Sequence, residues 1–454
     1  MTLFVITAQD PNSNREIKLD YNTSDSSLRD SEGNRIGFSG QRTFKDAVVF
    51  DKENPVGKSR SLKTLKIQLG LSCNYECTYC SQRFVPRAAE TNPDDIKDFL
   101  DNIEKNLQLG DGTNVKVELW GGEPFVYWKT MKPLVEQLHE KYPKMTFSTI
   151  TNGSLLTDDK VDWMYEMGFS FGMSHDGHAM KYRGPDPLDD PETRRVILRA
   201  YKMFRPEYRM SFNAMMHGEN TAREPIINFF KDFTGDESVI IGEGGLVDAY
   251  DDDAAAISLI TKKQQFEFRK TALKEFMGVP LFNWDNSKKV DKFIETIKGG
   301  KPFRAIAQKC GMDTTDNLAI DMKGNVLTCQ NVSTVSKNPA GTSHLAGNIE
   351  DMESVRVSAA THLSKRKECP TCPVVHVCQG SCMFLQGDLW KVSCDNAYSD
   401  AIGPWAYAIY KLTGFIPVWI EHESLPDYRK DIFGSMVEHK ETKKKPFPIP
   451  VVTA

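Results

Sequence analysis

The stretch Leu71–Gln82, LSCNYECTYCSQ, places Cys73, Cys77 and Cys80 on one short segment, with three residues between the first two and two between the last two. The preceding run Leu65–Leu69, LKIQL, is strand-like, so the cysteines lie on a loop directly after a predicted strand. Three thiolates on one loop can bind three irons of a four-iron cluster and leave the fourth iron open. Zinc is the alternative, but a closed structural zinc site needs four ligands, and no histidine lies within ten residues of this loop.

The sequence on the carboxyl-terminal side of this loop alternates between strand-like and helical segments as far as residue 245. Such βα alternation predicts an α/β fold with a parallel sheet and right-handed crossovers, here a partial (β/α)6 barrel. The unusual sequences follow the strands, which puts them at the rim where such folds place their chemistry. The expected strands are 65–69, 115–120, 145–150, 169–173, 208–216 and 238–242, and one of the expected helices is Pro191–Phe204.

Composition restricts the class of protein further. The chain has 454 residues, 40% of them hydrophobic, which is enough for two or three structural units. A net charge of −5 gives no basic surplus for a nucleic-acid partner. The N-terminus does not resemble a secretory signal, and the apolar stretch Trp405–Ile420 is too short and too interrupted to span a bilayer. We therefore expect a soluble, cytoplasmic protein whose ten cysteines serve metal or redox chemistry.

The spacing C-x3-C-x-aromatic-C after the first strand resembles that of the radical S-adenosylmethionine (radical SAM) enzymes, over roughly residues 62–245. The resemblance implies that Cys73, Cys77 and Cys80 hold a [4Fe–4S] cluster whose open iron is chelated by the amino and carboxylate groups of SAM. Reduction by a flavodoxin or a ferredoxin-type donor would then cleave SAM to methionine and a 5′-deoxyadenosyl radical. Tyr79 occupies the aromatic position of the family and is expected to pack on the adenine.

Three further loops at the rim are similar to loops of the same enzymes. The segment Gly121-Gly122-Glu123-Pro124 matches the GGEP loop, in which Glu123 or a nearby backbone carbonyl would receive the ammonium group of SAM. Asn152 lies in the segment TNG and Ser174 in the segment SHDG, with Ser174 expected near the ribose or the carboxylate of SAM. Arg183 stands where several relatives have an arginine that pairs with the carboxylate; a solvated surface arginine is the alternative.

The seven remaining cysteines follow the pattern of the SPASM domain, a loop-rich iron–sulfur extension of radical SAM enzymes that act mainly on peptides and proteins. By that resemblance they hold two auxiliary [4Fe–4S] clusters, giving three clusters in the chain. A zinc ribbon at CPTC (Cys369–Cys372) is the alternative, but it would leave the other cysteines unexplained. The first auxiliary set is Cys310, Cys329 and Cys382, and the second is Cys369, Cys372, Cys378 and Cys394.

The first auxiliary set has only three cysteines, whereas relatives complete it with an extra cysteine a few residues after the position of Cys310. Here that segment reads GMDTTD and contains none. The fourth ligand is then an oxygen of Asp313 or Asp316, or the iron is open and faces the substrate. Asp316 ranks above Asp313 because it lies closer to the position of the extra thiolate, although it could instead cap the following turn.

We expect four parts in the chain. Residues 1–60 are turn-rich and β-like, residues 61–300 form the radical SAM barrel, residues 301–400 form the auxiliary-cluster domain, and residues 401–454 form a C-terminal helix and tail.

The resemblance favours oxidative modification or cross-linking of a ribosomally made peptide, through a C–C, C–O or C–S bond. Sulfatase maturation is the first alternative, but the aspartate base of that branch is replaced here by Gln330, which cannot accept a proton at neutral pH. The winged-helix leader-binding domain common in peptide maturases does not match the short β-rich N-terminal region. Two further hypotheses are a radical SAM enzyme acting on a small metabolite and a non-catalytic electron-transfer protein with several clusters.

Overall fold

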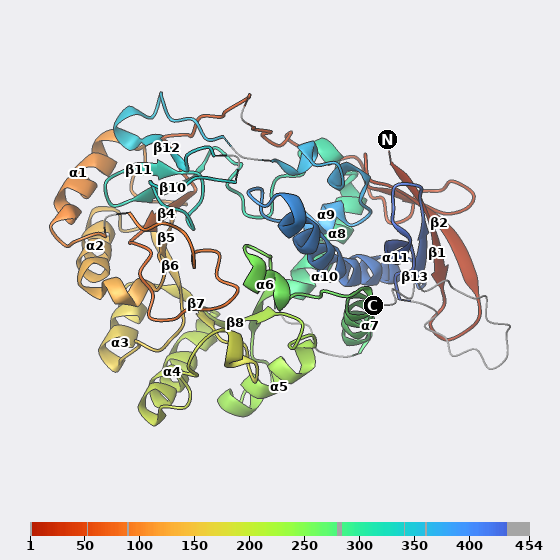
Figure 1. Cartoon of the computed structure of the whole chain (residues 1–454), viewed down its shortest axis with the longest axis horizontal. Helices are drawn as coiled ribbons and strands as arrows, with labels where there is room; N and C mark the ends of the chain where they lie inside the picture. The colour runs from red at the N-terminus through yellow and green to blue at the C-terminus, as the bar shows by residue number, and fades with distance from the viewer. Residues whose placement is uncertain are drawn as a thin grey trace.

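The computed structural model of the chain is a mixed α/β architecture built on two sheets (Figure 1). It describes residues 2–51, 53–88, 90–278, 284–339, 341–358 and 361–433. The larger sheet and its covering helices form one half of the molecule. The smaller sheet lies at the opposite end, beyond a group of helices from the second half of the chain (Figure 1).

Six parallel strands in sequential order form the centre of the larger sheet, which confirms the βα alternation predicted from the sequence. Helices connect successive strands and cover one face, where they bury residues such as Leu119, Phe147 and Phe212. In β8 the buried residues alternate with half-buried ones, so that only one face of this strand packs in the core. The strands are β4 (Thr64–Gln68), β5 (Lys116–Trp120), β6 (Thr146–Thr151), β7 (Ser170–Ser174), β8 (Met210–Met216) and β9 (Ile241–Leu246). The helices are α1 (Asp95–Asn106), α2 (Trp128–Lys141), α3 (Asp158–Glu166), α4 (Pro191–Phe204) and α5 (Arg223–Thr234).

Three strands from the predicted auxiliary region extend the same sheet. Strand β10 (Asn317–Asp321) runs parallel to β4, with Ile320 opposite Ile67. Strands β11 (Asn325–Leu327) and β12 (Leu345–Asn348) add an antiparallel edge. The region that contains Cys310 and Cys329 is therefore anchored directly beside the strand that leads into the first cysteine loop.

The smaller sheet joins the two ends of the described chain. Strands β1 (Leu3–Gln9), β2 (Glu16–Asn22) and β3 (Ser27–Arg29) confirm that the N-terminal region is β-rich, and β1 also pairs with β13 (Ile416–Glu421). In β1, Phe4 and Ile6 are fully buried and alternate with the exposed residues Leu3 and Val5. This buried face packs against Trp405 of α10, which is itself fully buried.

The helices between the two sheets come from the second half of the chain. They are α6 (Asp252–Ala256), α7 (Lys262–Met277), α8 (Trp284–Gly299), α9 (Val375–Cys378), α10 (Gly387–Thr413) and α11 (Asp427–Lys430). The predicted boundary at residue 400 falls inside α10, and the predicted C-terminal tail lies beyond residue 433, outside the described residues. Among the described helices, none combines the length and the apolar character needed to cross a bilayer.

Candidate functional site

The first cysteine loop and the GGEP loop are hydrogen-bonded to one another at the carboxyl-terminal ends of β4 and β5. The amide of Gly122 donates to the Gly70 carbonyl at 3.0 Å, and the amide of Glu123 donates to the Ser72 carbonyl at 3.0 Å. A Cβ atom on Gly122 would lie 2.4 Å from the Ser72 carbonyl oxygen and 2.6 Å from that of Leu71. Glycine is required here because the two backbones approach too closely for a side chain.

Replacing Gly122 by alanine should therefore weaken SAM binding, because we expect this loop to line the SAM site. Overpacking of this kind costs about 1–3 kcal/mol, and 1.4 kcal/mol corresponds to about tenfold in affinity. Equilibrium dialysis of SAM against the anaerobically reconstituted protein measures the change. Gly57→Ala is the matched control, since the atom nearest to its added Cβ lies 3.6 Å away. Unchanged SAM affinity in Gly122→Ala would show that this loop does not shape the site.

The carboxylate of Glu123 binds groups of the protein itself. It accepts hydrogen bonds from the amides of Phe125 (3.1 Å) and Asn152 (2.8 Å) and from the hydroxyl of Thr151 (2.8 Å). Burial raises the pKa of Glu123, while these three donors favour its charged form. Glu123 thus fastens the end of β5 to the end of β6, and Pro124 next to it is buried in a short 3-10 helix. Of the two expected acceptors for the ammonium group of SAM, a backbone carbonyl fits this arrangement better.

Asn152 and Ser174 lie on the same rim. The side-chain amide of Asn152 donates to the side-chain oxygen of Asn74, within the first cysteine loop, at 2.9 Å. Ser154 continues this contact by accepting a hydrogen bond from Asn74 at 2.8 Å. Ser174 is the last residue of β7 and is half-buried. The predicted SAM-contacting residues therefore lie around one loop, at the ends of four neighbouring strands.

Tyr79 and Arg183 meet at a buried carboxylate that we did not single out from the sequence, Asp176. The Tyr79 hydroxyl donates to Asp176, and the Arg183 guanidinium pairs with the same carboxylate at 2.8 Å. The Arg183 side chain is 8% exposed and the Asp176 side chain is 0% exposed. The amide of Met215 in β8 also donates to Asp176, at 2.9 Å. Arg183 is thus not the solvated surface arginine considered as an alternative. An acid directly after a strand end, two residues beyond Ser174, was the available signal for Asp176.

Arg183 also places a positive charge beside the first cysteine group. Burial raises the pKa of Cys77 to about 12, the Arg183 charge opposes this effect, and the thiols of Cys80 and Cys73 add to it. Burial also raises the pKa of Cys80, and the charge of Arg183 again opposes this shift. The three thiols therefore lie close enough to influence one another, and a neighbouring cation favours the thiolate forms that a metal needs.

The remaining cysteines also influence one another's pKa values, in two further groups. Burial raises the pKa of Cys329 to about 11 and that of Cys382 to about 12. Cys310 adds to the shift at Cys329, and both Cys329 and Cys310 add to the shift at Cys382. Tyr250, which precedes α6, packs against the same hydrophobic cluster as Cys382. Burial and then Cys382 raise the pKa of its phenol well above its usual value, and Asp248, Cys329 and Cys310 add to the shift.

The last four cysteines form the third group. Burial raises the pKa of Cys369 strongly, and Cys378, Cys372 and Cys394 all add to it. Cys394 lies on α10 and accepts a hydrogen bond from the Arg429 guanidinium at 3.4 Å. All ten cysteines are free thiols, and their assignment to three clusters stays a prediction. Within the described chain, no set of three His, Cys, Asp or Glu side chains surrounds a position for a single metal ion.

The two aspartates considered as the fourth ligand of the first auxiliary set differ in their surroundings. Asp316 forms an ion pair with Lys63 at 2.7 Å, with its side chain 31% exposed. Asp313 is 3% exposed, and one of its oxygens, Oδ1, is buried with no hydrogen-bond partner in the part of the chain that the structure describes. The thiol groups and this oxygen fit iron–sulfur ligation in their chemistry.

The first auxiliary group is attached to the rim of the large sheet from two sides. Gln68 of β4 donates to the carbonyls of Gln330 and Val332, both at 2.7 Å, and Trp120 of β5 donates to Asn331 at 2.7 Å. These contacts hold the segment directly after Cys329. On the other side, the hydroxyl of Ser381, next to Cys382, donates to Asp248 beyond β9.

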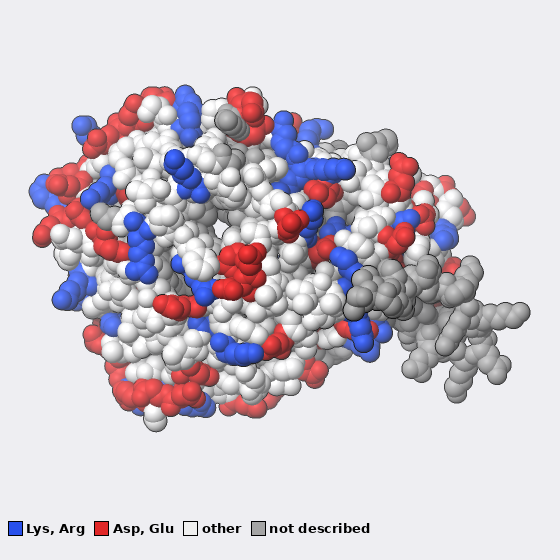
Figure 2. All heavy atoms as spheres, in the orientation of Figure 1, with Lys and Arg blue, Asp and Glu red and all other residues white. Residues whose placement is uncertain are grey.

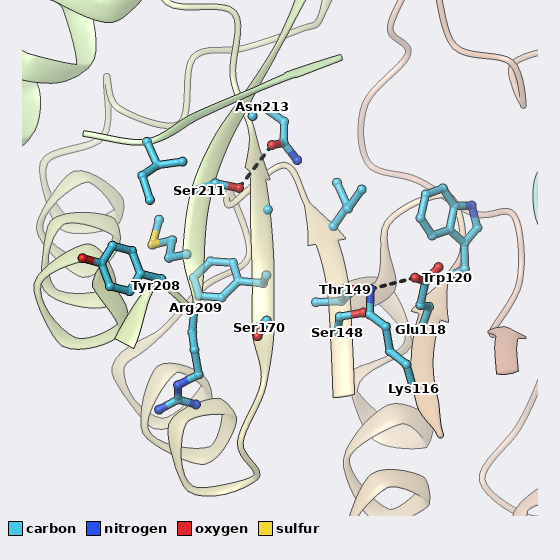
Figure 3. Close-up of a pocket in the computed structure, with 16 residues that line it drawn as sticks. Lys116, Glu118, Trp120, Ser148, Thr149, Ser170, Tyr208, Arg209, Ser211 and Asn213 are labelled. Atoms are coloured by element: carbon cyan, nitrogen blue, oxygen red, sulfur yellow. Dashed lines mark hydrogen bonds and ion pairs between the residues drawn. The ribbon is translucent and has the colours of Figure 1, made fainter. Parts of the chain in front are cut away.

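A cavity of about 440 Å³, lined by both polar and apolar residues, runs along the face of the large sheet that the helices leave uncovered (Figure 3). Glu118 pairs in it with Lys116 and with Lys66, each at 2.8 Å, and the Lys66 side chain is only 10% exposed. Ser211 donates to Asn213 at 3.3 Å. In the space-filling view the molecule is hollowed near its centre, and acidic and basic side chains are intermixed around the hollow (Figure 2).

The comparisons with known proteins agree with this geometry. Residues 67–230 match the model of the radical SAM superfamily. The chain is 18% identical to the radical SAM cyclopropyl synthase TigE of Paramaledivibacter caminithermalis, over 77% of this chain and 74% of that protein. It is 24% identical to a cysteine-type anaerobic sulfatase-maturating enzyme of Clostridium perfringens, over 68% of this chain and 85% of that protein. The solved structure of anSMEcpe with bound AdoMet and the Cp18Cys peptide shares its fold, with a TM-score of 0.53 and 20% identity over 77% of this chain and 97% of that one.

Proposed function

Residues 67–230 are a radical SAM domain and the chain is an enzyme, and from this premise we propose that it oxidatively modifies or cross-links a ribosomally made peptide. In this proposal Cys73, Cys77 and Cys80 hold the cluster that binds SAM, and the other seven cysteines hold two auxiliary clusters. A flavodoxin or a ferredoxin-type protein would supply the electron.

The proposed reaction removes two hydrogen atoms from the peptide. When bound and reduced, the first cluster supplies the electron that splits SAM into methionine and a 5′-deoxyadenosyl radical. The peptide gives one hydrogen atom to this radical, which becomes 5′-deoxyadenosine. To close a C–C, C–O or C–S bond, the peptide must also release one electron to an acceptor and one proton to solvent.

The protein's own residues position these partners. Asp176 orients Tyr79 and Arg183 beside the first cysteine loop, and the charge of Arg183 favours thiolates there. Glu123 fixes the backbone that would receive the ammonium group of SAM. These groups are buried and hydrogen-bonded before any substrate arrives, so little reorganisation is needed on binding.

The attachment of the first auxiliary group to the rim is the observation that carries the proposal. Gln68 and Trp120 hold the segment after Cys329 at the ends of β4 and β5, the strands that lead into the SAM loops. An electron acceptor at this place lies beside the site where a substrate radical would form. A non-catalytic electron carrier would have no need of this placement next to an open iron.

A peptide or protein as substrate is supported by the similarity to a protein-modifying relative. The C. perfringens relative is named for maturing sulfatases, which are proteins. Sulfatase maturation itself is the second candidate, favoured by that similarity. Gln330 argues against it, because the side chain next to Cys329 is an amide that accepts from the Cys329 thiol at 3.7 Å and cannot act as a base.

The experiment uses the full chain, reconstituted anaerobically and reduced with dithionite, with SAM and a panel of candidate substrate peptides. A peptide product lighter by two hydrogen atoms, formed together with 5′-deoxyadenosine, is the expected result. A product aldehyde that reacts with a hydrazine would identify sulfatase-type maturation. Cleavage of SAM without any peptide product would point to a small metabolite as substrate.

The first auxiliary group should be needed for the product and not for SAM cleavage. Alanine at Cys310, Cys329 and Cys382 should remove about four irons per chain and abolish the peptide product. Formation of 5′-deoxyadenosine should stay within about twofold of wild type, since the SAM cluster is separate. Product formation at the wild-type rate in this variant would refute the role of the auxiliary group.

A further inference from the structure

We propose that Oδ1 of Asp313 is the fourth ligand of the first auxiliary cluster, in place of the cysteine that the segment after Cys310 lacks. The inference rests on the proposed function in one respect, namely that Cys310, Cys329 and Cys382 hold an iron–sulfur cluster. It assigns to Asp313 the role that the sequence alone favoured for Asp316.

The carboxylate of Asp313 has one oxygen that is hydrogen-bonded and one that is not. The residue is 3% exposed, and its Oδ2 accepts hydrogen bonds from the amide of Gln308 at 2.7 Å and from Nε2 of His362 at 3.3 Å. Oδ1 is buried and has no hydrogen-bond partner among the described residues. A buried carboxylate oxygen without a donor is unfavourable, so such atoms in native proteins usually mark a ligand, an ion or a water.

This carboxylate also lies within the loop that carries Cys310. Because Asp313 Oδ2 binds the amide of Gln308, its side chain closes the segment 308–313 across its own ends, with Cys310 inside the segment. Gly311 makes the turn, with φ of +67° and its amide bonded to the Gln308 carbonyl at 3.0 Å.

The segments carrying the other two cysteines meet at the same place. The side chain of Gln308 donates to the carbonyl of Ser381, the residue before Cys382, at 3.3 Å. Met312, next to Asp313, is fully buried in a cluster with Leu327 and Met383, and Cys329 packs against that cluster. Asp313 therefore lies where the three cysteine-bearing segments converge.

Lys58 holds the loop in this position. Its ammonium group donates to the carbonyls of Met312 and Thr314, both at 2.7 Å, and of Asn317 at 2.9 Å. The carbonyls on both sides of Asp313 are thus fixed by one cation. The same cation offsets part of the negative charge that a carboxylate and three thiolates would bring together.

Asp316 has none of these features and provides a matched control. Its carboxylate is already paired with Lys63 at 2.7 Å, and its side chain is 31% exposed. Asp316→Ala removes a carboxylate three residues away in the same loop, without touching Gln308, His362 or the cysteines.

The test uses the full chain with Cys73, Cys77 and Cys80 replaced by alanine, so that only the auxiliary clusters contribute. The protein is labelled with ¹³C at its aspartate carboxyl carbons, and the reduced clusters are examined by pulsed electron paramagnetic resonance. We expect a strong ¹³C coupling that disappears in Asp313→Cys and persists in Asp316→Ala. In Asp313→Ala we expect the loss of about one iron per chain. The labelled parent needs no change at Asp313, so a folding defect in a variant cannot obscure the answer.

Absence of a ¹³C coupling in a parent that holds both auxiliary clusters would overturn the assignment of Asp313 and leave the proposed function standing. A coupling that is lost in Asp316→Ala and kept in Asp313→Cys would transfer the role to Asp316. A parent that binds no auxiliary iron at all would contradict the proposed function itself.

Discussion

Alanine at Cys73, Cys77 and Cys80 should reduce the cleavage of SAM to the rate of a protein-free control. The three thiols form one group beside Arg183, and we expect them to be the protein ligands of the cluster that chelates SAM. Because the auxiliary thiols lie in separate groups, about eight of about twelve irons per chain should remain. The measurement is the yield of 5′-deoxyadenosine and methionine after reduction with dithionite, together with an iron determination.

Two outcomes would contradict this expectation, and a further variant serves as a control. A variant that still forms 5′-deoxyadenosine would show that the first cysteine loop does not hold the cluster that binds SAM. A variant that loses all of its iron would show that the three groups do not load independently. Glu76→Ala provides a control, since it changes the same loop at an exposed residue that is not expected to bind iron or SAM.

Replacing Arg223 by alanine should cause a large loss of stability. Arg223 begins α5 and pairs with Glu275 of α7 at 3.5 Å and with Asp400 of α10 at 3.1 Å, and the Arg223 side chain is 3% exposed. Removing one partner of a buried ion pair costs about 3–5 kcal/mol, and here Asp400 keeps a second cation, Lys289, at 3.1 Å. Glu275 keeps the amides of Arg223 and Glu224 as donors, so we expect the lower end, about 3 kcal/mol.

The loss of stability in Arg223→Ala should depend on pH. Burial raises the pKa of Glu275 in the folded protein, and Arg223 opposes this shift, so the variant should raise that pKa further. A raised pKa in the folded state means that the folded protein binds the proton more tightly than the unfolded chain. The free energy of unfolding then falls as pH rises from the ordinary pKa of a glutamate through the raised pKa of Glu275. The stability that the variant loses relative to wild type should therefore be larger at neutral than at acidic pH.

Urea denaturation at two pH values measures this effect. Arg195→Ala is the matched control, because Arg195 pairs with Asp158 and Glu192 at an exposed surface where its side chain is 47% exposed. Exposed pairs contribute about 0–1 kcal/mol. Equal denaturation midpoints for the two variants would show that the Arg223 cluster does not fasten α5 to α7 and α10.

The local features of the site could be predicted from the sequence because each of them depends on residues that lie close together in the chain. Cysteine spacing after a strand, and glycine pairs after the next strand, depend on a few neighbouring residues. The division of ten cysteines into three groups came from a resemblance and stays a prediction; within each expected group, thiols raise one another's pKa. The parallel order of β4 to β9 follows from βα alternation and the handedness of crossovers.

The features that were missed depend on contacts between distant segments. Strand β13 pairs with β1 across almost the whole chain, and β10 joins β4 although more than two hundred residues separate them. No local pattern specifies such partners. The pairing of Arg183 with Asp176, and the difference between Asp313 and Asp316, depend on which carboxylate the fold buries.

We propose above all that the ten cysteines hold three separate four-iron clusters, of which one binds SAM and two are auxiliary. Iron and acid-labile sulfide per chain in the anaerobically reconstituted wild-type protein test it most directly. We expect about twelve irons and about twelve sulfides per chain, with no tightly bound zinc. About four irons per chain accompanied by stoichiometric zinc would contradict it.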